Sequence, residues 1–189
     1  MGLKARFLAA AVFLSFFWGF AEATVFFIVP DVLISLVAVL SRSLFLRAAL
    51  AALAGALVGG AAVYLAASHS PAVVSAIMRS VPFVTDLMIA KVRNQYADMG
   101  NWAMFYGSVS GTPYKLYAFA APAYSGLSVF VAVSIPARLL RFLVVGGVAA
   151  LAAYLLRRYL SCSDRMLTVI HAAAWIVFYI FYWATILKA

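Results

Sequence analysis

Long apolar stretches, each broken at a few polar positions, dominate the chain. The first runs from residue 7 to residue 40 and is interrupted mainly by Glu22, Pro30 and Asp31. A helix needs about 20 apolar residues to cross a hydrocarbon core about 30 Å thick. This stretch is therefore too long for one straight span and too short for two complete ones.

Two interpretations of the first stretch are open. Either residues 7–29 cross the membrane and residues 32–40 form a half-helix, or the segment enters the membrane and turns back as a hairpin. Pro30 removes a backbone donor near the far end, which favours a break there. Irregular backbone at membrane depth is tolerated only where protein or a water-filled cavity covers it. Both interpretations thus place Glu22 and Asp31 inside the protein.

A second broken stretch lies in the other half of the chain. Residues 101–124 are apolar but contain Gly111-Thr112-Pro113, through which a straight helix is not expected. Residues 58–62 and 145–149 (VGGAA and VGGVA) recur at similar places after the two breaks. Paired, proline-interrupted hydrophobic segments in two halves are typical of transporters built from inverted repeats.

The remaining segments are simpler. Gly55 and Gly59 give one long apolar helix a small-residue face, which favours close packing inside the molecule over a dimer contact. The sequence predicts an all-α polytopic membrane protein with two re-entrant or broken-helix hairpins, transmembrane helices and an inverted repeat. Its single membrane domain, residues 1–189, divides into a first hairpin (7–40), a transmembrane helix (44–67), an interfacial amphipathic stretch interrupted at Pro82 (70–100), a second hairpin (101–124) and two transmembrane helices (126–157 and 165–187).

Composition supports a membrane protein. Hydrophobic residues make up 68% of the 189 residues and charged residues 10%, against about half and a quarter in soluble domains. The net charge of +9 is spread between apolar runs, which suits lipid head groups and does not suggest nucleic acid. No Cys/His cluster or phosphate-binding glycine loop is present, so we expect no metal, no cofactor and no enzyme activity. Oligomeric state is left open.

The ends of the helices indicate an orientation. If the hairpins enter from opposite faces, seven cations lie on one side and four on the other, which favours the first side as cytoplasmic. The seven are Lys4, Arg6, Arg42, Arg47, Arg157, Arg158 and Arg165, and the four are Arg79, Lys91, Arg93 and Lys188.

The start of the chain also has features of a signal peptide. Lys4 and Arg6 precede the apolar run, and Ala21-Glu22-Ala23 has the form of a cleavage site. We expect the segment to be retained, because residues 24–29 are more apolar than the start of a typical mature domain.

Candidate chemistry lies where charges interrupt apolar runs. A carboxylate at the bilayer centre costs roughly 2.5–3.5 kcal/mol on insertion scales, so Glu22 and Asp31 should meet partners. Lys115 follows the second break, and Ser134, Arg138 and Arg141 share one stripe of a helix. The predicted site therefore combines the charges Glu22, Asp31, Lys115, Arg138 and Arg141 with the hairpin breaks Pro30, Gly111 and Pro113. Buried ion pairs that only fix packing, or arginines that reach the head groups, are the plainer interpretation.

These features resemble the DedA superfamily, and most closely its YqaA-like branch, the bacterial relatives of lipid scramblases with the VTT or SNARE-associated domain. The resemblance rests on the acidic-proline-acidic opening, on residues 111–117 (GTPYKLY) and on residues 138–142 (RLLRF), within residues 15–160. It implies two membrane-embedded hairpins that point at each other, and lipid translocation across the bacterial inner membrane. Family substrates include undecaprenyl phosphate and phospholipids, and transport depends on the proton motive force.

The chain departs from the family pattern in ways that affect substrate choice. Ser110 and Lys115 stand where many members have two arginines, and lysine does not grip phosphate bidentately. Glu22 and Asp31 are also closer together than the acidic pair of better-studied members. Our hypothesis is that Lys115, Arg138 and Arg141 neutralise a lipid phosphate, while Glu22, desolvated among phenylalanines, binds a proton.

Three alternatives remain beside lipid translocation. The same charges would serve a proton-coupled transporter of a small solute, and a structural membrane protein needs none of this chemistry. Ser108-Val109-Ser110-Gly111 is one residue away from the rhomboid protease motif Gly-x-Ser-Gly, with His171 on another helix. A Ser–His pair needs hydrogen-bond contact, so this near match is weak.

Overall fold

The computed structural model describes residues 3–186, which form helices and no strand. The α-helices are α1 (Leu3–Thr24), α2 (Asp31–Leu40), α3 (Arg42–His69), α4 (Pro71–Ser80), α5 (Asp86–Met99), α6 (Ala103–Ser110), α7 (Tyr114–Ala120), α8 (Leu127–Leu160) and α9 (Asp164–Ile186), with short 3-10 helices η1 (Gly100–Trp102) and η2 (Ala121–Ala123). The predicted all-helical class is confirmed for these residues.

Three of the described helices are long and apolar enough to cross a membrane, namely α3, α8 and α9. The apolar parts of the first two helices are shorter and cover Ala10–Thr24 and Asp31–Leu40. By length and composition, the chain is therefore a membrane protein.

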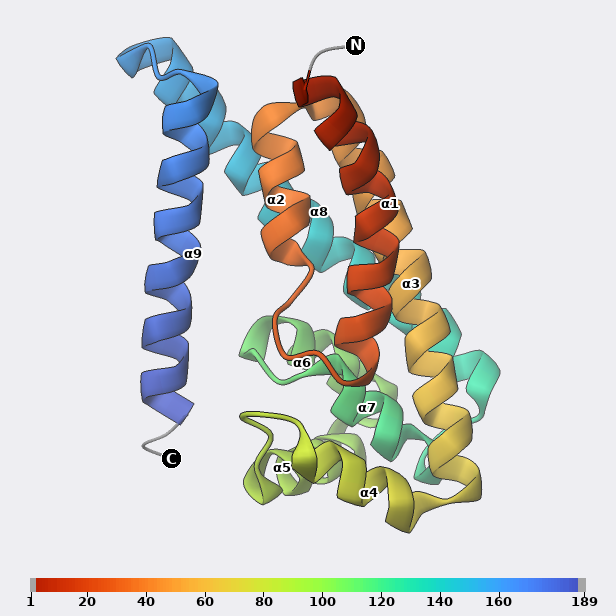
Figure 1. Ribbon diagram of the computed structural model, residues 1–189. Helices are drawn as coiled ribbons and strands as arrows, with labels where there is room; N and C mark the ends of the chain where they lie inside the picture. The colour runs from red at the N-terminus through yellow and green to blue at the C-terminus, as the bar shows by residue number, and fades with distance from the viewer. Residues whose placement is uncertain (1–2, 187–189) are drawn as a thin grey trace.

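The helices α1 and α2 form a hairpin. They run in opposite directions, so that the N-terminal end of α1 and the end of α2 lie at the same end of the molecule (Figure 1). Pro30 immediately precedes α2 with a φ of −67°, a conformation that suits the start of a helix. Asp31 occupies the first turn, where a negative charge is favoured by the helix dipole. The chain thus turns back between α1 and α2, and residues 31–40 form a short helix of 10 residues.

The long helix α3 packs tightly against α1. A Cβ added at Gly55 would collide with the carbonyl of Phe16, and one added at Gly19 would collide with the carbonyl of Ala52. The two backbones touch at these points, which only glycine permits. The predicted small-residue face of α3 therefore packs inside the molecule, as expected.

The helices α6 and α7 form a second, shorter hairpin. Gly111 ends α6 in the left-handed region with a φ of +76°, and Pro113 is extended before α7. All seven residues of α7 are buried. The predicted break at Gly111 and Pro113 is confirmed, and it places a polar turn beside a completely buried helix.

The helices α4 and α5 lie across the end of the molecule opposite the N-terminus (Figure 1). Between them the chain leaves the helical conformation around Pro82, where the sequence predicted an interruption. The hydroxyl of Thr85 accepts a hydrogen bond from the backbone N–H of Met88 at 3.2 Å and so caps α5. The buried face of α5 carries Ile89, Val92 and Tyr96.

The last two helices have different surroundings. The tilted helix α8 passes behind α2, α1 and α3 and continues through Pro136 without a break (Figure 1). The helix α9 stands at one edge of the molecule, and most of its side chains are exposed.

Candidate functional site

The turns of the two hairpins meet near the middle of the molecule (Figure 1). The ammonium of Lys115, at the start of α7, donates a hydrogen bond of 2.6 Å to the carbonyl oxygen of Phe26 in the first turn. This contact joins residues 89 positions apart in the sequence. It occurs where both backbones are irregular, so polar groups are concentrated at one place in an apolar molecule.

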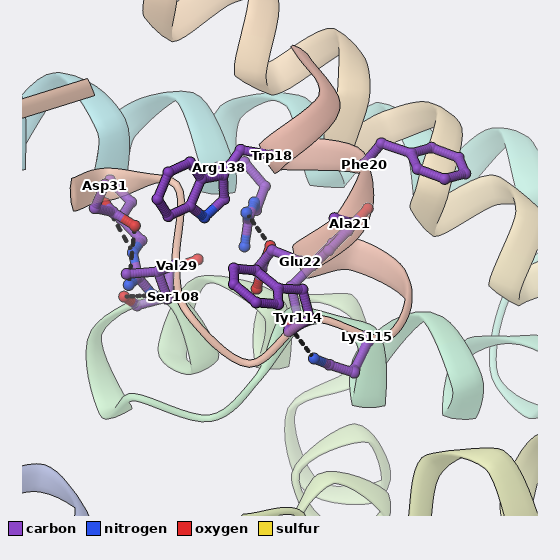
Figure 2. Close-up of polar contacts among 12 residues, drawn as sticks. Trp18, Phe20, Ala21, Glu22, Val29, Asp31, Ser108, Tyr114, Lys115 and Arg138 are labelled. Carbon is purple, nitrogen blue, oxygen red and sulfur yellow. Dashed lines mark hydrogen bonds and ion pairs between the residues drawn. The ribbon is translucent and has the colours of Figure 1, made fainter. Parts of the chain in front are cut away.

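Glu22 and Arg138 form an enclosed ion pair beside this contact. The Arg138 Nη2 and Glu22 Oε2 atoms are 2.6 Å apart, and each side chain is only 4% exposed. The guanidinium also lies 4.6 Å from the centre of the Tyr114 ring and 5.0 Å from that of Phe142, within the range of cation–π contacts. Figure 2 shows Glu22, Arg138 and Tyr114 grouped together. This pair fixes α1 to α8.

Asp31 and Arg141 form a second, more open pair. Their closest nitrogen and oxygen atoms are 3.2 Å apart, and the Arg141 side chain is 17% exposed where that of Asp31 is 1% exposed. Arg141 also donates a hydrogen bond of 3.3 Å to the carbonyl of Ser108 in α6. The Arg141 guanidinium therefore contacts both hairpins and remains partly accessible.

Lys115 is the third cation, and it is 1% exposed. No carboxylate of the described residues lies within ion-pair distance of it, and its bond to Phe26 is to a neutral carbonyl. Three buried or half-buried cations thus accompany two carboxylates. When all five groups are ionised, the cluster carries one excess positive charge.

A small cavity of about 50 Å³ connects these groups. Glu22, Lys115 and Arg141 all line it, together with Gly111 and Tyr182. A water molecule needs roughly 10–15 Å³ of such volume, so the cavity has room for a few. The structure thus brings the sequence-predicted charges together around a cavity with a mixed polar and apolar lining, and Arg138 and Asp31 are the ion-pair partners of two of its lining residues.

The helix α9 supplies two tyrosines that sequence reasoning missed. The Tyr179 hydroxyl accepts a hydrogen bond of 2.9 Å from the backbone N–H of Val29, and the Tyr182 hydroxyl donates one of 2.8 Å to the carbonyl of Gly111. Each tyrosine therefore binds the turn of one hairpin. Together with Trp175 they recur at positions i, i+4 and i+7, a stripe that marks one helix face.

Glu22 is buried as expected, at 3% exposure, and its carboxylate faces the guanidinium of Arg138. His171 does not pair with the near-rhomboid serines. Its ring nitrogen lies 2.8 Å from the hydroxyl of Ser35 in α2, whereas Ser108 bonds the carbonyl of Met104 and Ser110 bonds Thr112.

Comparison of the chain with protein-family models, curated proteins and solved structures found no match. Among the described residues, no three His, Cys, Asp or Glu side chains are placed to hold a metal ion. The features that bear on the function of the site are therefore its charges, its burial and the cavities around it.

Proposed function

We propose that this chain is a multi-pass protein of the bacterial cytoplasmic membrane that moves a phosphate-bearing lipid between leaflets, in the manner expected of the DedA superfamily. In this proposal the α1–α2 and α6–α7 hairpins enter the membrane from opposite faces, are related as an inverted repeat, and meet at the translocation site. The substrate class includes phospholipids and undecaprenyl phosphate.

The observation that carries the proposal is that three basic and two acidic side chains gather at the meeting point of the hairpins, so that basic groups outnumber acidic ones. A buried charge left without a partner destabilises a protein by about 3–5 kcal/mol, so the cluster is suited to an anion. A phosphodiester carries one negative charge, which matches the excess. A lipid supplies that charge while its hydrocarbon remains in the bilayer.

The two cations that line the central cavity differ in what they offer a phosphate. Arg141 has a planar fork of donors that can bind two phosphate oxygens at once, and Lys115 offers a compact point charge. Both line the central cavity, whereas Arg138 is enclosed between Glu22 and two aromatic rings. In our proposal Arg141 and Lys115 contact the substrate and Arg138 positions the first hairpin.

Protons enter the proposal through the two carboxylates. Protonation of Glu22 or Asp31 removes a negative charge from the cluster and raises its positive excess by one. Phosphate binding then raises the affinity for the proton, and proton binding raises the affinity for phosphate by the same factor. Deprotonation on the opposite side of the membrane would favour release.

Lipid movement in reconstituted vesicles tests the proposal. Vesicles carrying a fluorescent phosphatidylglycerol are exposed to an impermeant quencher, and the rate at which inner-leaflet lipid becomes accessible is measured. A hydrogen bond to a charged group is worth about 1.5–3 kcal/mol, so Lys115→Ala should slow transport by roughly 10–100-fold. Glu22→Gln should also slow it.

The matched control is Lys91→Ala, which removes an exposed lysine of α5 and should leave the rate unchanged. Wild-type rates in both Lys115→Ala and Glu22→Gln would show that the site assignment is wrong. Uptake of a small solute without lipid movement would favour the proton-coupled solute transporter. Movement of neither would favour a structural protein.

A further inference from the structure

A lateral groove leads from the surface of the molecule to Arg141. It has a volume of about 360 Å³ and lies between α6, α8 and α9. Its walls include Phe105, Val109, Leu140, Val144 and Phe178, and Arg141 closes its inner end. Val109 is 87% exposed and Leu140 56% exposed, so the groove opens on the side of the molecule that a bilayer would surround.

Arg141 is shared by two cavities. It lines the central cavity, whose lining also includes the charged groups of Glu22 and Lys115, and it lines the lateral groove. The groove is apolar apart from Ser108 and Arg141 itself. An amphiphile has the same division, with a charged group at one end and hydrocarbon at the other.

The Arg141 guanidinium determines which kind of amphiphile the groove would bind. Lipid chains are as apolar as leucine, so contact with the apolar walls does not select one membrane component over another. A partly exposed guanidinium at the inner end does select, since it favours phosphate over an uncharged head group. The volume falls within the range of about 300–1,000 Å³ that is typical of ligand sites.

We infer that the groove between α6, α8 and α9 binds the hydrocarbon chain of a phosphate-bearing lipid whose phosphate lies at Arg141. The lipid then reaches the central site sideways from the bilayer, between α6 and α9. This inference rests on the proposed function and adds to it a binding site for the tail and a direction of access.

Photolabelling tests the inference without measuring transport. The full-length protein in vesicles is illuminated with phosphatidic acid that carries a diazirine in its acyl chain, and labelled peptides are mapped by mass spectrometry. Diacylglycerol with the same chain serves as the uncharged probe. We expect phosphatidic acid to label α6 and residues 137–145 of α8 at least fivefold more than diacylglycerol does.

Two variants sharpen the result. Arg141→Ala should abolish the preference for phosphatidic acid, whereas Arg158→Ala, on the exposed end of the same helix, should not. Leu140→Trp fills the groove and should reduce labelling. Leu151→Trp is the matched control, because Leu151 lies on the same helix and is equally exposed, at 56%.

The possible outcomes separate this inference from the proposed function. Even labelling along α8, including the region of Leu151, or an unchanged preference in both Arg141→Ala and Leu140→Trp, would overturn the groove assignment. Preferential groove labelling in a protein that moves no lipid would support the binding site and contradict translocation. Lipid movement with no groove labelling would support translocation and contradict the binding site in the groove.

Discussion

The two carboxylate–arginine pairs differ in how closely the protein encloses them. Glu22 and Arg138 are both 4% exposed and the guanidinium is held between two aromatic rings, whereas Arg141 is 17% exposed and lines two cavities. An enclosed pair is costly to open, while a pair whose guanidinium is partly exposed can exchange its partner more readily. We therefore assign stability mainly to the first pair and substrate contact mainly to the second.

This division predicts a pattern of stabilities. Arg138→Met leaves the Glu22 carboxylate buried without a partner, which costs about 3–5 kcal/mol when a buried pair is broken. The double variant Glu22→Gln/Arg138→Met removes both charges and should recover much of that loss. Thermal unfolding in detergent, followed by size-exclusion of the remaining folded protein, measures the order of the three melting temperatures.

Arg158→Met is the control for the loss of an arginine from α8, and it should unfold like the unmodified protein because Arg158 is exposed. If the double variant is less stable than Arg138→Met alone, Glu22 stabilises the protein through contacts other than its ion pair with Arg138. The cation–π contacts with Tyr114 and Phe142 could not account for that difference, because both variants have already lost them.

The convergence of the five charged side chains could be predicted from the sequence, but their pairing could not. Charges inside apolar runs are expensive in lipid, which is why Glu22, Asp31, Lys115, Arg138 and Arg141 could be expected to converge. Which carboxylate meets which arginine depends on the rotation of α8 relative to the first hairpin. Three residues of spacing between two arginines do not determine that rotation.

At the scale of elements, α9 has few ties to the remainder of the fold. Its side chains are mostly exposed, yet its two tyrosine hydroxyls bind Val29 in one hairpin turn and Gly111 in the other. Tyr182 also lines the central cavity. The position of α9 therefore depends on contacts with both turns at once, and movement of either turn would displace this helix.

Removal of both hydroxyls should loosen α9. Each hydrogen bond contributes about 1 kcal/mol net, so Tyr179→Phe/Tyr182→Phe should shift the docking equilibrium of α9 by roughly 30-fold. Spin labels at the exposed positions 109 and 177 report the distance between α6 and α9, in a Cys162→Ser background because Cys162 is the one cysteine of the sequence. The distance distribution should broaden toward longer values.

Tyr159→Phe provides the control, since Tyr159 is 78% exposed on α8. It should leave the distribution unchanged. An unaltered distribution in the double variant would mean that apolar contacts, such as the stacking of Trp183 on Phe83, suffice to hold α9.

For the molecule as a whole, the positions of proline and glycine predicted the fold better than the overall composition did. Pro82, Gly111 and Pro113 lie where the chain is not helical, because proline lacks a donor and glycine tolerates a positive φ, and Pro30 stands directly before the start of α2. The sequence left open whether the first stretch turns back, since that depends on the packing of α1 on α3. The contacts of α9 with the two hairpin turns were also missed, because a stripe of aromatic residues also occurs on helices that face lipid.

The distribution of charge over the whole molecule yields a prediction of topology. Arg42 and Arg47 follow the end of α2, and the junction of α8 and α9 lies at this same end of the molecule, while α4 and α5 lie at the other (Figure 1). The described cations thus separate as the sequence predicted, and Lys188 lies outside the described residues. Cytoplasmic loops are enriched in Lys and Arg, so the end that carries Arg42 should face the cytoplasm.

Single cysteines at two exposed positions test this, Ser43→Cys at the first end and Ser80→Cys at the second, again with Cys162→Ser. An impermeant maleimide added to intact cells should label the cysteine at position 80 and should reach position 43 only after the membrane is opened. The opposite pattern would invert the orientation, and with it the side from which each hairpin enters. Labelling of both positions in intact cells would mean that α3, the long apolar helix between them, does not cross the membrane.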